Sequence, residues 1–272
     1  MQTLSRAAGY ATAFDVRDLE QHVRALIRAS ADWAAARWRL LAHMAVMACV
    51  IPPLQVDGED ADLIKLVFVV IFVVLSFSLH EAAHAWVAWK CGDPTAKDLG
   101  RITFNPIPSI DPIFSIAMPA AAMLFNLPLI GGARPVPVSY NRLRSPARDM
   151  MLVALAGPAT NFLLAIVFML GLKLSVYYLD FSTQSILARV FLSALKWNVS
   201  LAVFNMLPIP PLDGSRVVAW LLPASLREPF HMLERFGLVL VLVAVQIPAI
   251  RYLYRQGTYE LYDLIAFLVG GL

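Results

Sequence analysis

The sequence predicts an all-α polytopic membrane protein, with about six transmembrane helices, a small membrane-associated β-hairpin and a re-entrant segment. Hydrophobic residues make up 59% of the 272 residues and charged residues 15%, with a mean hydropathy of +0.67. A soluble domain of this length is rarely so apolar. Several apolar runs approach the roughly 20 residues that a helix needs to cross a bilayer. Lys and Arg are unevenly distributed between these runs, as expected for loops on two sides of a membrane.

The first part of the chain predicts an amphipathic arm. Apolar residues recur at helical spacing among arginines in this part: Val16, Leu19, Val23, Leu26, Ile27 and Trp33 among Arg17, Arg24, Arg28, Arg37 and Arg39. This pattern is typical of a helix that lies on an anionic membrane face, and a helix that binds a soluble partner is an equally good interpretation. We therefore expect a cytoplasmic arm at residues 1–39 and a membrane-embedded domain at residues 40–272, with its core at residues 63–218.

The apolar runs predict the spans. Clear candidates for transmembrane helices are Leu63–Trp86, Met151–Leu172, Ile186–Leu207 and Phe236–Ile250. Each is long enough, or nearly so, to cross the hydrocarbon core of a bilayer as a helix.

Three further apolar segments have shorter or interrupted patterns. Leu40–Leu54 predicts a span that ends at a pair of prolines, and Leu261–Leu272 predicts a re-entrant or peripheral segment. Pro112–Ile130 contains two internal prolines, which disfavour a continuous helix. A crossing there would also place the Arg134–Arg148 cluster outside, so we expect this segment to be re-entrant or to rest on the membrane.

The charged residues predict the orientation of these spans. Lys and Arg are frequent between Trp86 and Met151, residues 175–185 contain neither, and residues 57–62 are acidic. Because positively charged loops face the cytoplasm, we expect a multi-pass protein of the plasma (cell inner) membrane whose N-terminus and Trp86 end are cytoplasmic. The same rule accounts for the net charge of +3, so we expect the lipid bilayer as a partner and no nucleic acid. The sequence carries no signal for an oligomeric state.

A metal-binding motif lies inside the first clear span. His80 and His84 are four residues apart, which on a helix places them on one face about 6 Å apart along the axis. Glu81 follows the first histidine, and this arrangement is typical of zinc hydrolases in which the glutamate acts as a general base. Ionisable residues are costly to place within a membrane span, which favours a functional interpretation over two structural histidines.

Asp213 is the best candidate for a third ligand. Catalytic zinc takes three protein ligands and keeps one position open. Asp213 follows the Ile186–Leu207 run, after prolines that end a helix and leave irregular backbone, which at membrane depth occurs only inside protein or beside a water-filled cavity. The predicted topology brings it to the same side of the membrane as His84. Capping of a helix that begins near Ser215 is an alternative role for this aspartate.

Two segments, residues 80–84 and 205–214, resemble the motifs of the site-2 protease family of intramembrane zinc metalloproteases. Further matches occur at residues 92–96, 100–106 and 156–161, so the resemblance runs in order from about Leu63 to Val218. The resemblance implies that His80, His84 and Asp213 bind one Zn²⁺ per chain and that Glu81 is the general base. It also implies that residues 101–105 form a membrane-associated strand that pairs with substrate.

The resemblance extends to two amides and to the substrate. It implies that Asn205 and Asn161 hold the substrate backbone or stabilise the oxyanion, and a structural hydrogen bond between helices is an open alternative for each. Substrates of the family are membrane-anchored proteins, which are cut within or near their transmembrane segments. Two departures stand out: Ser109 occupies a position where the closest subfamily has histidine, and we expect a compact form without a PDZ or CBS domain.

Two other classes of function fit parts of the pattern. In a metal-ion transporter, the histidines and the aspartate would form a transit site, but such a site does not need Glu81 between the histidines. A catalytically silent homologue would act as a membrane chaperone or regulator, against which the full set of matched residues argues.

Overall fold

The computed structural model describes residues 59–103, 105–106, 135–178 and 185–270. The elements in these ranges are all helical: α2 (Glu59–Lys90), α3 (Thr95–Asp98), η3 (Tyr140–Arg142), α5 (Pro146–Lys173), η4 (Leu174–Tyr178), α6 (Ile186–Asn205), α7 (Asp213–Leu221), α8 (Ala224–Met232), η5 (Leu233–Phe236), α9 (Gly237–Ala244) and α10 (Pro248–Leu268). No β-strand occurs in these ranges, and the prediction of a mainly helical protein is confirmed.

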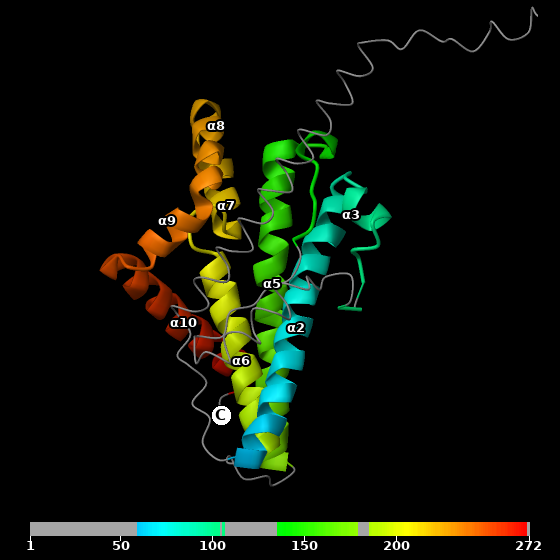
Figure 1. Cartoon of the computed structure of the whole chain (residues 1–272), viewed down its shortest axis with the longest axis vertical. Helices are drawn as coiled ribbons and strands as arrows, with labels where there is room; N and C mark the ends of the chain where they lie inside the picture. The colour runs from blue at the N-terminus through cyan, green and yellow to red at the C-terminus, as the bar shows by residue number, and fades with distance from the viewer. Residues whose placement is uncertain (1–58, 104, 107–134, 179–184, 271–272) are drawn as a thin grey trace, which may run out of the picture. The chain divides into compact units, whose positions relative to one another are not determined.

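Helices α2, α5 and α6 form the framework of the described part. They are the three described helices that are long and apolar enough to cross a membrane, which agrees with three of the predicted spans. The three helices pack against one another, with α5 antiparallel to α2 and α6 (Figure 1). The last turns of α2 and α6 therefore lie at the same end of the framework as the first turns of α5. Every candidate metal ligand lies in the half of the framework nearer this end.

The outer face of α5 is apolar. Leu163, Val167 and Leu170, followed by Leu174 at the start of η4, recur every three or four residues and are all about half exposed or more. A continuous apolar stripe of this kind is rare on a protein surface in water but is what a helix presents to lipid. The opposite face of α5 supplies Phe168 and Met169 to a core that it shares with α6 and α10. The distribution of exposed side chains thus agrees with a helix at the border between protein and bilayer.

Helix α2 ends in a Schellman motif. The N–H of Gly92 donates to the carbonyl of Trp89 at 3.1 Å, and the N–H of Asp93 donates to that of Ala88 at 2.9 Å. This motif requires a left-handed residue after the helix, and Gly92 has φ = 110°. The sharp turn leads the chain away from the end of α2 while leaving the motif helix regular through both histidines.

Prolines and a small apolar core determine the course of the chain from α6 to α7. Pro208, Pro210 and Pro211 cannot donate the backbone hydrogen bonds of a continuing helix, and α6 ends at Asn205. Leu212, which is fully buried, then packs in a cluster with Phe204, Leu207, Val241 and Val245. This cluster anchors the residue immediately before Asp213.

One predicted span is wrong as a continuous helix. The structure divides Phe236–Ile250 into α9, which has 8 residues, and the start of α10 at Pro248. Eight helical residues extend only about 12 Å, well short of the roughly 30 Å of a hydrocarbon core. The physical reason lies at Ile247, which precedes proline and adopts extended backbone (φ −74°, ψ 121°), because proline disfavours helical geometry in the residue before it.

Several other predictions are only partly covered by the described residues. Residues 101–103 and 105–106 form no strand, so the β-hairpin is not confirmed. Most of Leu261–Leu272 belongs to α10, which begins well before it. The arm at residues 1–39, the span Leu40–Leu54, Ser109 and the segment Pro112–Ile130 lie outside the described residues, and predictions for them stay predictions.

Asp93 joins the end of α2 to the segment that precedes η3. Its side chain is fully buried. Oδ1 accepts hydrogen bonds from the N–H and the hydroxyl of Thr95, at 3.1 and 2.5 Å, and Oδ2 accepts one from the N–H of Ser139 at 2.6 Å. One carboxylate thus holds together two parts of the chain that are far apart in sequence.

We expect Asp93→Ala to destabilise the protein, because a buried donor left unpaired costs about 1–3 kcal/mol and two N–H groups would lose their partner. The measurement is the melting temperature of the full chain in detergent. Asp98→Ala, which removes an exposed carboxylate on α3, is the matched control. Equal melting temperatures for the two variants would contradict the expectation.

Candidate active site

His80 and His84 face each other from successive turns of α2. Both side chains are buried, at 4% and 8% exposure, and their Nε2 atoms are 3.0 Å apart. The rings are nearly perpendicular, with an interplanar angle of 86°. The helical spacing read from the sequence therefore does bring two imidazole nitrogens to one point.

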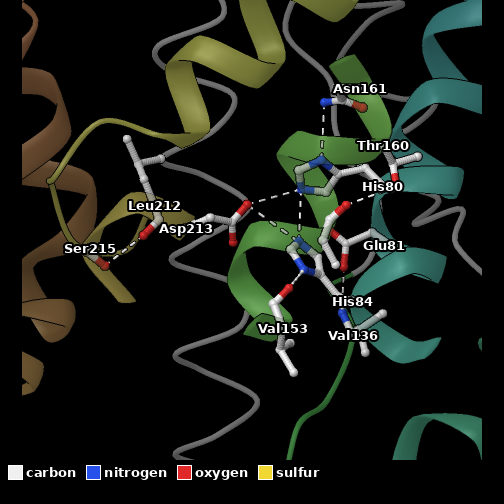
Figure 2. A network of polar contacts seen from close by, with 11 residues as sticks. His80, Glu81, His84, Val136, Val153, Thr160, Asn161, Leu212, Asp213 and Ser215 are labelled. Carbon is white, nitrogen blue, oxygen red and sulfur yellow. Dashed lines mark hydrogen bonds and ion pairs between the residues drawn. The ribbon is translucent and has the colours of Figure 1, made fainter. Parts of the chain in front are cut away.

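Asp213 approaches the same point from the start of α7 (Figure 2). Its Oδ2 atom lies 3.3 Å from Nε2 of His80 and 3.5 Å from Nε2 of His84. The residue at the N-cap position of α7 is Leu212, and no side-chain hydrogen bond caps this helix. The Asp213 side chain thus points at the histidines and does not cap α7.

The three ligand atoms are spaced as a tetrahedral zinc site requires. Zinc bonds of about 2.0–2.1 Å at tetrahedral angles separate neighbouring ligand atoms by about 3.3–3.4 Å. The observed separations are 3.0, 3.3 and 3.5 Å. Among the described residues, this trio is the group of His, Cys, Asp and Glu side chains whose ligand atoms converge closely enough to hold a metal ion.

The hydrogen-bond partners of these side chains also favour a cation between the three ligand atoms. Nδ1 of His84 lies 2.6 Å from the carbonyl oxygen of Val153, to which it donates, so Nε2 of the same ring carries a lone pair. Oδ2 of Asp213 is buried and has no hydrogen-bond donor within the described part of the chain. Burial raises the pKa of the Asp213 carboxyl, but the charges of His84 and His80 and their hydrogen bonds to it together lower it by more, so the pKa lies below its ordinary value. When the His84 ring is neutral, its Nε2 lone pair and a carboxylate oxygen of Asp213 face each other, as metal ligands do.

Glu81 lies beside this cluster on the next position of α2. Its Oε2 accepts a hydrogen bond from the backbone N–H of Val136 at 2.8 Å, and the side chain is partly exposed. Arg101 donates to the carbonyl of the neighbouring Pro135 at 3.4 Å. The carboxylate is therefore oriented by the chain segment before η3, while Figure 2 shows it turned away from the histidine nitrogens that face Asp213. Glu81 is not among the side chains whose ligand atoms converge on one point.

The two predicted amides occupy different places. Asn161 lies on α5 and is fully buried, and its Nδ2 is 3.2 Å from Nδ1 of His80. Asn205 is the last residue of α6 and is also buried. Two backbone groups of the site, the carbonyl of Val153 and the N–H of Val136, were not among the predicted residues, because a backbone contact leaves no residue-type signature in a sequence.

The structure combines helices of membrane-spanning length with a His–His–Asp cluster and an adjacent glutamate. This combination is typical of a membrane-embedded, metal-dependent hydrolase. Residues 67–245 match the model of peptidase family M50. This match covers more than half of the chain, and the chain belongs to this family, as the resemblance to site-2 proteases implies. It is a zinc metalloprotease of the membrane.

Three relatives illustrate the similarity. YwhC of Bacillus subtilis, whose name assigns it provisionally to the zinc metalloproteases, is 37% identical over 73% of this chain and 85% of its own length. Rip2 of Mycolicibacterium smegmatis, named in the same way, is 28% identical over 92% and 91% of the two chains. Rip2 of Mycobacterium tuberculosis is 31% identical over 73% and 74%. No solved structure matches the chain significantly.

Proposed function

We propose that this metalloprotease cleaves peptide bonds within or near the transmembrane segments of membrane-anchored proteins, on the cytoplasmic side of the cell inner membrane. His80, His84 and Asp213 are the zinc ligands and Glu81 is the general base. The observation that carries the proposal is the spacing of the three ligand atoms, 3.0–3.5 Å, beside three helices of membrane-spanning length.

The side of the membrane is inferred from charge. The end of the framework nearer the cluster carries exposed cations, at Lys90, Lys97, Arg142, Arg144 and Arg148. Lys90 and Lys97 both lie over the ring of Trp89, with Nζ at 4.4 and 4.3 Å from its centroid. Aromatic and basic residues together are typical of the cytoplasmic interface of a membrane protein, and this supports a site that opens toward the cytoplasm.

The proposed reaction is hydrolysis of a peptide bond. Bound zinc would supply Lewis-acid chemistry, which lowers the pKa of water to about 7 and polarises the scissile carbonyl. Glu81 takes the proton from the attacking water and passes it to the leaving amine, so that the same carboxylate serves as base and then as acid. Asn205, buried at the end of α6, is the proposed donor to the oxyanion or to the substrate backbone.

The substrate must change shape before the reaction. A transmembrane helix satisfies its backbone polar groups internally, which hides each carbonyl from attack. We therefore propose that the substrate unwinds locally near the membrane surface and enters the site as an extended peptide. Extended backbone would then find hydrogen-bond partners in the protease, in the manner of a strand that is added to an edge.

The test is cleavage of a model single-span substrate by the purified full chain. We expect a chelator to abolish cleavage and added zinc to restore it, and Asp213→Ala to lose both zinc and cleavage, because two histidines alone leave the site one ligand short. Asp263→Ala, an exposed carboxylate on α10, is the control and should behave as wild type. Cleavage that survives chelation would contradict the proposal, and zinc uptake into sealed vesicles without cleavage would favour a transporter.

A further inference from the structure

Asn161 contacts a proposed zinc ligand from inside the helix packing. It lies on α5, has no exposed surface, and points its amide at the Nδ1 edge of the His80 ring, 3.2 Å away (Figure 2). The Nε2 edge of the same ring faces Asp213 and His84. The amide and the metal cluster are therefore on opposite edges of one imidazole.

The proton on this ring depends on which end of the amide faces it. An amide nitrogen donates to Nδ1, which puts the ring proton on Nε2 and leaves no lone pair there for a metal. An amide oxygen accepts from Nδ1–H, which leaves the lone pair on Nε2. A half-turn of the amide exchanges the two ends at nearly the same positions, and Oδ1 of Asn161 otherwise has no hydrogen-bond partner among the described residues. Binding of zinc at Nε2 therefore selects the orientation in which the oxygen accepts.

The second histidine is held in the equivalent way by another group. Nδ1 of His84 donates to the carbonyl of Val153, also on α5 and two helical turns before Asn161. Metal-binding histidines generally donate their other ring N–H to a carbonyl or a carboxylate, and this partner orients the ring and raises its basicity. Helix α5 offers such an acceptor to each ring: a backbone oxygen for one and a side-chain oxygen for the other.

We propose that Asn161 is a positioning residue of the zinc site, whose amide oxygen accepts the Nδ1–H bond of His80 and holds the Nε2 lone pair toward the metal. The inference rests on the proposed ligand role of His80. It differs from the expectation that Asn161 holds the substrate or the oxyanion, since the amide lies behind the ring and acts through it.

Two substitutions separate these roles. Asn161→Leu keeps the approximate size and removes the acceptor, and Asn161→Asp keeps an acceptor oxygen at the same place. We expect Asn161→Leu to weaken zinc binding about 10–100-fold, the usual effect of losing an outer partner, and Asn161→Asp to bind zinc at least as tightly as wild type. The readouts are the zinc dissociation constant of the full chain in detergent, by competition with a chelating dye, and the absorption spectrum of the Co²⁺-substituted protein.

Asn198 supplies the matched control. It is also a fully buried asparagine on a framework helix, its Nδ2 donates to Ser76 of α2 at 2.9 Å, and its Oδ1 also has no partner within the described residues. Asn198→Leu should lower the melting temperature but leave the zinc dissociation constant unchanged. If Asn161→Leu also lowers only the melting temperature, Asn161 is structural and the proposal is overturned.

Asn161→Asp decides the question even if Asn161→Leu does not fold. A carboxylate cannot donate a hydrogen bond and repels an oxyanion, so a role in substrate or oxyanion binding predicts loss of cleavage with zinc affinity unchanged. That outcome would overturn the proposal, whereas retained zinc binding together with cleavage supports it. Failure of the wild-type chain to bind zinc would instead overturn the proposed function, so the two failures are distinguishable.

Discussion

Glu81→Gln is expected to stop proteolysis while zinc stays bound. General acid–base catalysis contributes about 10²–10⁴-fold to a rate, and an amide can neither take a proton from water nor return it to an amine. The variant should therefore cleave a single-span substrate at least about 100-fold more slowly than wild type. Glu81 is not one of the converging ligand atoms, so the zinc content should not change.

The fold should also survive this substitution. The carboxylate accepts a hydrogen bond from the N–H of Val136, and the oxygen of a glutamine amide accepts the same bond. Glu260→Gln, an identical change at an exposed site on α10, controls for the chemistry of the substitution. The measurements are the cleavage rate and the bound zinc of the three proteins side by side. Cleavage by Glu81→Gln at the wild-type rate would exclude Glu81 as the base. If wild type and Glu81→Gln both bind zinc and neither cleaves the substrate, a regulatory homologue would be favoured.

The ligands of the proposed site could be predicted because each leaves a local signal. His80 and His84 have helical spacing within a long apolar run, and that run forms one helix as expected. Asp213 follows prolines that must end a helix, and the short packed segment after α6 does return the chain to the histidines. Helix periodicity predicts the two histidines, and helix termination together with the predicted topology predicts Asp213 as the third ligand.

Other features depend on packing between distant parts of the chain. The N–H of Val136 and the carbonyl of Val153 reach the site only after α2 and α5 have packed, and any residue type offers the same backbone groups. The break between α9 and α10 is different, because Pro248 was visible in the apolar run. Hydropathy alone treats such a run as one span, and the restriction that proline places on the preceding residue should have weighed against it.

Gly157→Ala is expected to destroy the zinc site. Gly157 lies on α5 where the helix meets both histidines, and a Cβ atom there would lie 2.5 Å from Cε1 and Nε2 of His80 and from Nε2 of His84. The rings cannot readily move aside, since the carbonyl of Val153 and the amide of Asn161 contact their other edges. We expect zinc affinity to fall by at least the roughly 100-fold that follows loss of an outer partner, and cleavage to be lost with it.

Gly171 on the same helix makes this expectation specific to the site. Its Cβ would lie 3.0 Å from the nearest ring atom of Phe191, a less severe approach than the 2.5 Å at Gly157, and would meet neither histidine. Both substitutions favour helix formation by about 1 kcal/mol, so neither effect can be assigned to a weakened helix. Gly171→Ala should keep its zinc and its activity, while Gly157→Ala should lose both even if its melting temperature is unchanged. Tight zinc binding by Gly157→Ala would mean that α5 does not approach the two histidines this closely, and the geometry of the metal site would have to be revised.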